Sequence, residues 1–121
     1  LFRIQSEAIR KAAADHSCIF IGRCADYVLR DNPRCVNVFI TANMEDRIAS
    51  VMKWNNCTAE KAQEIIEKGD SERASFYNFY SSGTWGAAST YHLCINSSVL
   101  GIEETAVLIK NFVIQKLNLP Q

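Results

Sequence analysis

The sequence predicts a single small α/β domain built around a parallel sheet. Short, continuously apolar runs alternate with longer stretches in which apolar residues recur at helical spacing. Strands that are apolar throughout are typical of parallel sheets covered on both faces, because antiparallel strands usually alternate apolar and polar residues. The length of 121 residues and the 48% of hydrophobic residues fit one globular domain, 1–121.

The first third of the chain predicts two helices and two strands. Residues 1–14 carry apolar side chains at helical spacing, and residues 17–21 form a short β-favouring run closed by a glycine, which predicts a buried strand. Residues 23–29 predict a brief helix that ends at the Asp-Asn-Pro turn of residues 31–33. Residues 35–41 predict a second buried strand.

The middle of the chain predicts two helices followed by a mobile segment. Asn43 is a good N-cap for a helix over residues 44–54, and a further helix begins near Thr58. The helical pattern is expected to break at Gly69, after which the chain becomes rich in Phe and Tyr. The stretch that follows, residues 68–90, is the predicted mobile segment.

The last third predicts one strand and one amphipathic helix, over residues 91–96 and from Gly101 onward. In parallel sheets, ligands bind beyond the carboxyl ends of the strands. The sequence therefore directs attention to Gly22 and Arg23, to Thr41, and to residues 96–98.

Composition excludes several classes of function. Lys plus Arg and Asp plus Glu both number 13, so no net positive charge is available to hold a nucleic acid or an anionic membrane. No apolar run is long enough to span a bilayer. The 5 cysteines form no CxxC pair and do not cluster with histidine, so neither a metal site nor a disulfide framework is expected. These features predict a cytoplasmic protein with reduced thiols.

Two arginines are candidates for binding phosphate. Arg23 follows a glycine at a predicted strand end and presents a planar fork suited to phosphate, although a surface ion pair with Asp26 or Asp31 would explain it equally well. Arg73 lies one helical turn after Asp70, a spacing that fits either a solvated ion pair or an arginine delivered to a transferring phosphoryl group. Tyr77 belongs to an aromatic patch that could stack on a base or only pack the segment down.

Taken together, these features resemble the cytidylate kinase-like family. The resemblance covers nearly the whole chain in the right order, although no single motif is highly specific. The stretches that carry it are Gln5-Ser6-Glu7-Ala8-Ile9-Arg10, Ile19-Phe20-Ile21-Gly22-Arg23-Cys24-Ala25-Asp26-Tyr27, Asn37-Val38-Phe39-Ile40-Thr41-Ala42, Asp70-x-x-Arg73-x-x-x-Tyr77, Trp85-Gly86 and Leu93-Cys94-Ile95-Asn96-Ser97.

The resemblance implies a nucleoside monophosphate kinase that uses ATP and Mg²⁺ to phosphorylate CMP or a related small-molecule nucleotide. Arg73 and Asp70 would be catalytic, with residues 68–90 forming a lid. The residues that would bind the acceptor are Arg23, Gly22, Gln5 and Tyr77, and those on the donor side would be Arg47, Asn96 and Ser97. Arg47 is followed by fewer basic residues than is usual in cytidylate kinases.

The family fold implied is a three-layer α/β/α parallel sheet of the P-loop type. The sequence contains no G-x-x-x-x-G-K-[ST] pattern, so the N-terminal strand and the P-loop are expected to be absent and the chain to be inactive alone. Family topology would place that strand between residues 17–21 and 35–41. The alternatives to an enzyme are a non-catalytic nucleotide-binding domain or a domain whose terminal helices form a homo-oligomer.

Overall fold

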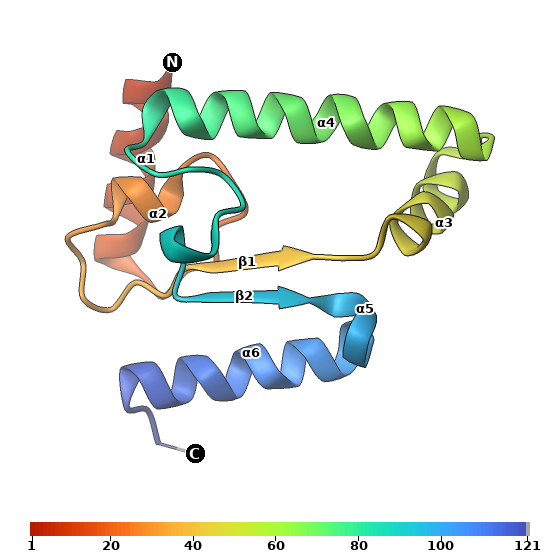
Figure 1. The fold of residues 1–121 in the computed structure, drawn as a ribbon. Helices are drawn as coiled ribbons and strands as arrows, with labels where there is room; N and C mark the ends of the chain where they lie inside the picture. The colour runs from red at the N-terminus through yellow and green to blue at the C-terminus, as the bar shows by residue number, and fades with distance from the viewer. Residues whose placement is uncertain (121) are drawn as a thin grey trace.

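The computed structural model describes residues 1–120 and is mostly helical (Figure 1). Its elements in chain order are α1 (Phe2–Asp15), α2 (Ala25–Val28), β1 (Val38–Thr41), α3 (Met44–Asn55), α4 (Ala59–Tyr80), the 3-10 helix η1 (Ala88–Thr90), β2 (Leu93–Asn96), α5 (Ser97–Leu100) and α6 (Ile102–Leu117). The helices predicted at both ends of the chain and over residues 44–54 are therefore confirmed.

The sheet consists of the two parallel strands β1 and β2. Val38 pairs with Leu93 and Thr41 pairs with Asn96, so both carboxyl ends lie at the same edge. Figure 1 shows α4 and α6 on opposite sides of the strand pair, with α1 and α2 near the amino ends of the strands and α3 beyond the carboxyl end of β1. The helices that follow the two strands, α3 and α5, therefore begin at the same end of the molecule.

The predicted three-layer parallel sheet is wrong, because residues 1–120 contain only these two strands. The run Ser17–Ile21 has strong β propensity but pairs with no strand, and a strand without a partner leaves its backbone groups unsatisfied. Ile19 and Ile21 are 94% and 91% exposed, so this run is not the doubly covered strand that its composition predicts. Local apolar composition predicts a strand here, whereas pairing decides whether one forms.

Helix α4 is longer than the sequence predicts. Instead of breaking at Gly69 it runs unbroken over its 22 residues from Ala59 to Tyr80, with Thr58 accepting a hydrogen bond from the Lys61 amide at its amino end. A single helical glycine costs only about 1 kcal/mol, which tertiary contacts override here. No helix within residues 1–120 is long and apolar enough to cross a membrane.

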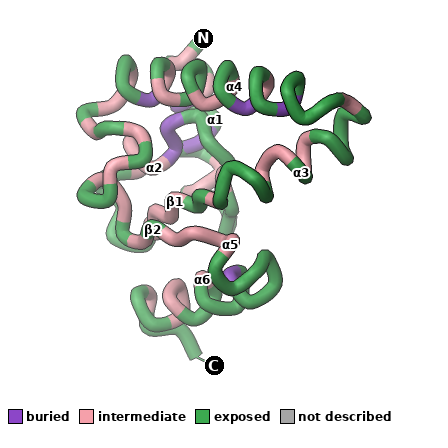
Figure 2. The backbone as a smooth tube through the Cα atoms, turned by 45° about the vertical axis from the view of Figure 1, so that its right-hand side comes forward, coloured by how far each residue is buried: buried purple, intermediate pink, exposed green. Residues whose placement is uncertain are grey.

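Many of the buried residues lie on α1 and α2, and others lie on the inner face of α4 and on α6 (Figure 2). Ile9, Ala25 and Val28 form one cluster, against which Phe2 and Phe20 pack. This cluster lies next to the turn that carries Arg23. The packing of α2 on α1 therefore holds in place the turn before α2, which the sequence predicts to bind a ligand.

Candidate functional site

A cluster of two arginines and one aspartate joins α3 to α4. Arg47, in the first turns of α3, donates two hydrogen bonds to the Asp70 carboxylate, at 2.9 and 2.6 Å. Arg73 donates a third, at 2.8 Å, to the oxygen that also accepts the shorter Arg47 bond. The side chains of Arg47 and Asp70 are only 28% and 27% exposed, whereas that of Arg73 is 56% exposed. One aspartate therefore orients two guanidinium groups, and one of these groups faces solvent.

The cluster arises from the periodicity of α4. Ala62 and Ile66 are buried on its inner face, and Asp70, Arg73 and Tyr77 continue the same face at steps of three or four residues. An inward face that is apolar, then charged, then apolar again is unusual, because charged side chains are rarely buried unless they are paired. Arg47 supplies that pairing from a different helix.

Gly69 makes room for the arginine that follows it. A Cβ atom placed on Gly69 would lie 3.0 Å from a terminal nitrogen of Arg73. The missing side chain therefore lets the Arg73 guanidinium fold back toward Asp70. The glycine that suggested a helix break instead serves the charged cluster.

The charges of the cluster reinforce one another. Hydrogen bonds from Arg47, and then those from Arg73, hold the pKa of Asp70 below its ordinary value against the opposing effect of burial. The hydrogen bond to Asp70 likewise raises the pKa of Arg47. Two guanidinium groups face one carboxylate, so the cluster carries a net charge of about +1 and attracts anions.

The side chains of Asn96 and Ser97, predicted to lie on the donor side, form hydrogen bonds that connect the ends of β1 and β2. The Asn96 side chain accepts a hydrogen bond from the Ser98 amide at 2.9 Å and donates one to Asn43 Oδ1 at 3.0 Å. Ser97 Oγ donates to the Thr41 carbonyl at 3.1 Å. These contacts tie the carboxyl ends of β1 and β2 together and set the start of α3, which carries Arg47.

The predicted acceptor-binding residues lie on other elements. Gly22 and Arg23 form an exposed turn before α2, and Gln5 is half-buried on α1. Among residues 1–120 Arg23 makes no ion pair, so the surface pair with Asp26 or Asp31 that the sequence allowed is not present. The structure brings Arg47 to Asp70 and Arg73, whereas within residues 1–120 neither Arg23 nor Gln5 forms a side-chain hydrogen bond or ion pair with that cluster.

The Tyr77 hydroxyl contacts Asp26, which the sequence suggested only as an ion-pair partner of Arg23. Its Oη donates a hydrogen bond of 2.6 Å to Asp26 Oδ2, across 51 residues of sequence. Burial, followed by this hydrogen bond to Asp26, raises the pKa of Tyr77, so the hydroxyl remains a donor. Only the position of Asp26, three residues after Arg23, could have drawn attention to it.

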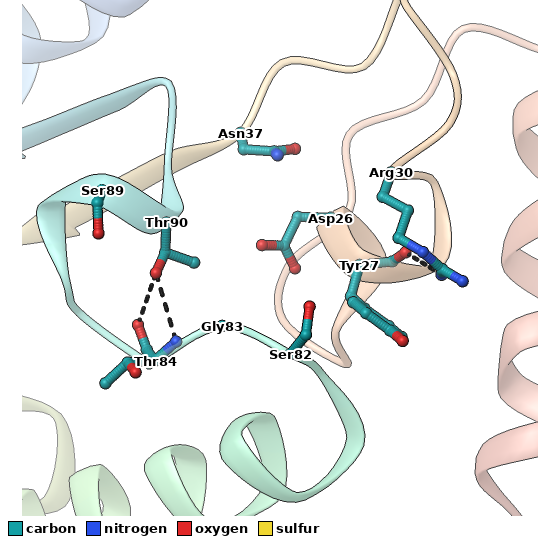
Figure 3. A pocket seen from close by; sticks show the side chains of 9 residues that line it. All are labelled: Asp26, Tyr27, Arg30, Asn37, Ser82, Gly83, Thr84, Ser89 and Thr90. Carbon is teal, nitrogen blue, oxygen red and sulfur yellow. Dashed lines mark hydrogen bonds between the residues drawn. The ribbon is translucent and has the colours of Figure 1, made fainter.

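A polar cavity of about 430 Å³ opens beside this contact (Figure 3). The residues that line it come from α2 and the turn after it, from the segment before β1, from the turn after α4 and from η1; they are Asp26, Tyr27, Arg30, Asn37, Ser82, Gly83, Thr84, Ser89 and Thr90. In Figure 3 the Asp26 carboxylate points into the space, whereas Arg30 turns back to donate to the Tyr27 carbonyl. The cavity offers hydroxyls and one carboxylate, and the guanidinium of Arg30, which also lines it, is turned toward the Tyr27 carbonyl.

The described residues do not form a dedicated metal site. Within residues 1–120, no three His, Cys, Asp or Glu side chains gather closely enough to hold a metal ion. Asp70 is already engaged by two arginines. Because Mg²⁺ in kinase sites is held largely by substrate phosphates and water, the ATP and Mg²⁺ implied by the family resemblance stay a prediction.

Comparison with known proteins identifies relatives of the chain. The sequence profile of the cytidylate kinase-like family matches residues 1–99. A crystal structure of an uncharacterized protein from Eubacterium ventriosum superimposes with a TM-score of 0.90 at 27% identity. The match covers 94% of this chain but only 65% of that one. No curated protein matches the sequence.

Proposed function

Because the chain belongs to the cytidylate kinase-like family, we propose that it serves phosphoryl transfer from ATP to CMP or a related nucleoside monophosphate. The observation that supports this proposal is the cluster of Arg47, Asp70 and Arg73. Kinases catalyse phosphoryl transfer mainly by positioning the reactants and stabilising charge, so oriented guanidinium groups are the chemistry required.

Arg73 is the residue that stabilises the phosphoryl group. A guanidinium carries five N–H donors, and Arg73 uses one nitrogen to reach Asp70 while more than half of its side chain remains exposed. The other donors are available to phosphoryl oxygens. Asp70 holds the guanidinium in place before the ligand arrives, which lowers the entropic cost of binding.

Arg47 and Asp70 act as the support of this arrangement. Arg47 spends two nitrogens on Asp70 and is mostly buried, so it contributes positive charge at the site rather than a free fork. Arg47, predicted from the sequence to lie on the donor side, therefore acts on the donor nucleotide through the positive electrostatic potential that it shares with Arg73. Arg23, exposed on its turn, binds the acceptor.

ATP with Mg²⁺ is the donor that we propose, and no cluster of three or more metal-ligating side chains lies within residues 1–120. The predicted donor-side residues Asn96 and Ser97 support the site by fixing the strand ends. Residues 68–90 would form the lid, of which the part up to Tyr80 is the end of α4.

The experiment is a coupled ADP-release assay on the protein at its natural length. ATP and Mg²⁺ are supplied with a panel of nucleoside monophosphates, and a reaction without acceptor measures background ATP hydrolysis. Release of ADP that depends on a cytidine nucleotide supports the proposal. Acceptor binding without turnover would instead identify a non-catalytic nucleotide-binding domain, and no binding would contradict both.

A further inference from the structure

The turn that carries Arg23 has an unusual backbone. Gly22, Arg23 and Cys24 have consecutive φ angles of 72°, 61° and 56°, all in the left-handed region. Glycine adopts this region freely, but each non-glycine residue there costs on the order of 1 kcal/mol or more. Such a conformation persists only where surrounding contacts hold it, so the contacts of this turn matter for the direction in which Arg23 points.

Two contacts connect the turn to the carboxyl end of α4. The Cys24 side chain is 3% exposed, and its sulfur lies 4.0 Å from the Tyr77 carbonyl oxygen. The Tyr77 hydroxyl donates to Asp26 at 2.6 Å, a short bond of the strength expected for a carboxylate acceptor. Tyr77 itself is 8% exposed and stacks on Tyr91 with a ring separation of 6.1 Å. The bond is therefore half-buried: Tyr77 is covered, while the Asp26 carboxylate borders the polar cavity.

The same helix face carries the charged cluster. Tyr77 follows Arg73 by one turn of α4, a rise of about 6 Å along the helix axis. A contact that fixes the Arg23 turn against Tyr77 therefore fixes it relative to Arg73 and Asp70 as well. Transfer of a phosphoryl group held by Arg73 to a nucleoside monophosphate held by Arg23 would require that relative position.

We propose that Asp26 is a positioning residue: it accepts the Tyr77 hydrogen bond and thereby holds the left-handed turn that carries Arg23 at a set place beside the Arg73 face of α4. This inference rests on the proposed function, and it adds a residue to which the family resemblance assigned no role. Tyr77, predicted from the sequence to bind substrate, acts here through Asp26 instead.

The test uses Tyr77→Phe in the protein at its natural length, because this change removes only the hydroxyl. We expect acceptor affinity, measured by calorimetry with CMP, to fall about tenfold, as loss of one bond to a charged acceptor implies. The apparent affinity for ATP stays unchanged. Tyr80→Phe, the same substitution three residues later on α4, is the matched control and keeps wild-type affinity.

Two further variants separate positioning from direct contact with the ligand. If Asp26 acts through Tyr77, Asp26→Ala weakens CMP binding as much as Tyr77→Phe does. The double variant then binds CMP with the same affinity as either single variant. Asp26→Asn, which retains an acceptor oxygen, restores most of the affinity. Additive losses in the double variant would mean that the two side chains contact the ligand independently, and would overturn the inference.

Hydrogen exchange without ligand completes the test. Tyr77→Phe should speed exchange of the backbone amides of residues 22–26 relative to wild type, which loss of a ligand contact alone would not do. Unchanged exchange together with unchanged CMP affinity would overturn the positioning role while leaving the proposed function standing. A wild-type protein that binds no nucleoside monophosphate would overturn the proposed function and the positioning role together, whereas the exchange data would still report whether the contact holds the turn.

Discussion

Replacing Asp70 by asparagine removes the charge that holds two arginines together while keeping the size of the side chain. The Arg47 pair is two-thirds or more buried and makes two bonds, and a hydrogen bond between charged groups contributes about 1.5 to 3 kcal/mol. The asparagine carbonyl can retain one of these bonds. The Arg73 pair is more exposed and contributes at most about 1 kcal/mol. We expect Asp70→Asn to lower the free energy of unfolding by about 2 kcal/mol.

This loss should depend on pH in a defined direction. The folded-state pKa of Asp70 lies below its ordinary value, so the ion pairs stabilise the protein above the unfolded-state pKa of about 4. That contribution disappears as the pH falls through the folded-state pKa, because the folded protein then takes up the proton as well. The difference between wild type and Asp70→Asn should therefore be full at pH 7 and shrink below about pH 4.

Urea unfolding at pH 7 and pH 3 measures both effects. For a protein of this size, 2 kcal/mol shifts the urea midpoint by about 1 to 2 M. Glu72→Gln is the matched control, because Glu72 lies on the same helix and forms no ion pair within residues 1–120. An Asp70→Asn difference below about 0.5 kcal/mol, or one of equal size at both pH values, would refute the reasoning.

Three other substitutions have distinct expected results. Gly69→Ala should leave the melting temperature equal or higher, since alanine favours a helix by about 1 kcal/mol. It should nevertheless lower turnover, because its Cβ displaces the Arg73 guanidinium from Asp70. Unchanged turnover in the ADP-release assay would contradict this. Arg23→Ala should chiefly weaken acceptor binding, and normal CMP affinity by calorimetry would argue against a site at that turn. Thr105→Val should raise the melting temperature, because the buried Thr105 hydroxyl has no hydrogen-bond partner within residues 1–120 and its burial costs about 1 kcal/mol or more; a lower melting temperature would show that the hydroxyl is satisfied.

The sequence predicts individual elements of this fold better than it predicts their assembly. Helical spacing places α1, α3 and α6, and apolar composition places β1 and β2, because both signals are local. The run Ser17–Ile21 carries the same β signal but forms no strand, since strand formation requires a partner that composition does not specify. The predicted three-layer sheet was wrong for this reason.

The candidate site shows the same division between local and long-range information. The pair of Asp70 and Arg73 follows from their spacing, whereas the stronger pair of Asp70 and Arg47 joins residues 23 positions apart. Reading the inner face of α4 through Gly69 would have shown that Asp70 faces inward and needs a partner. The contact between Asp26 and Tyr77 spans 51 positions and no spacing rule points to it.

The measurement that tests the central claim most directly is the turnover of Arg73→Ala against its acceptor affinity. We expect kcat to fall by roughly a hundredfold or more, while the dissociation constant for the acceptor stays within about threefold, because the guanidinium stabilises charge that develops during transfer. Lys68→Ala, an exposed cation on the same helix, is the control and should retain wild-type turnover. A wild-type kcat in Arg73→Ala, or a loss of efficiency explained entirely by weaker acceptor binding, would contradict the role assigned to the cluster.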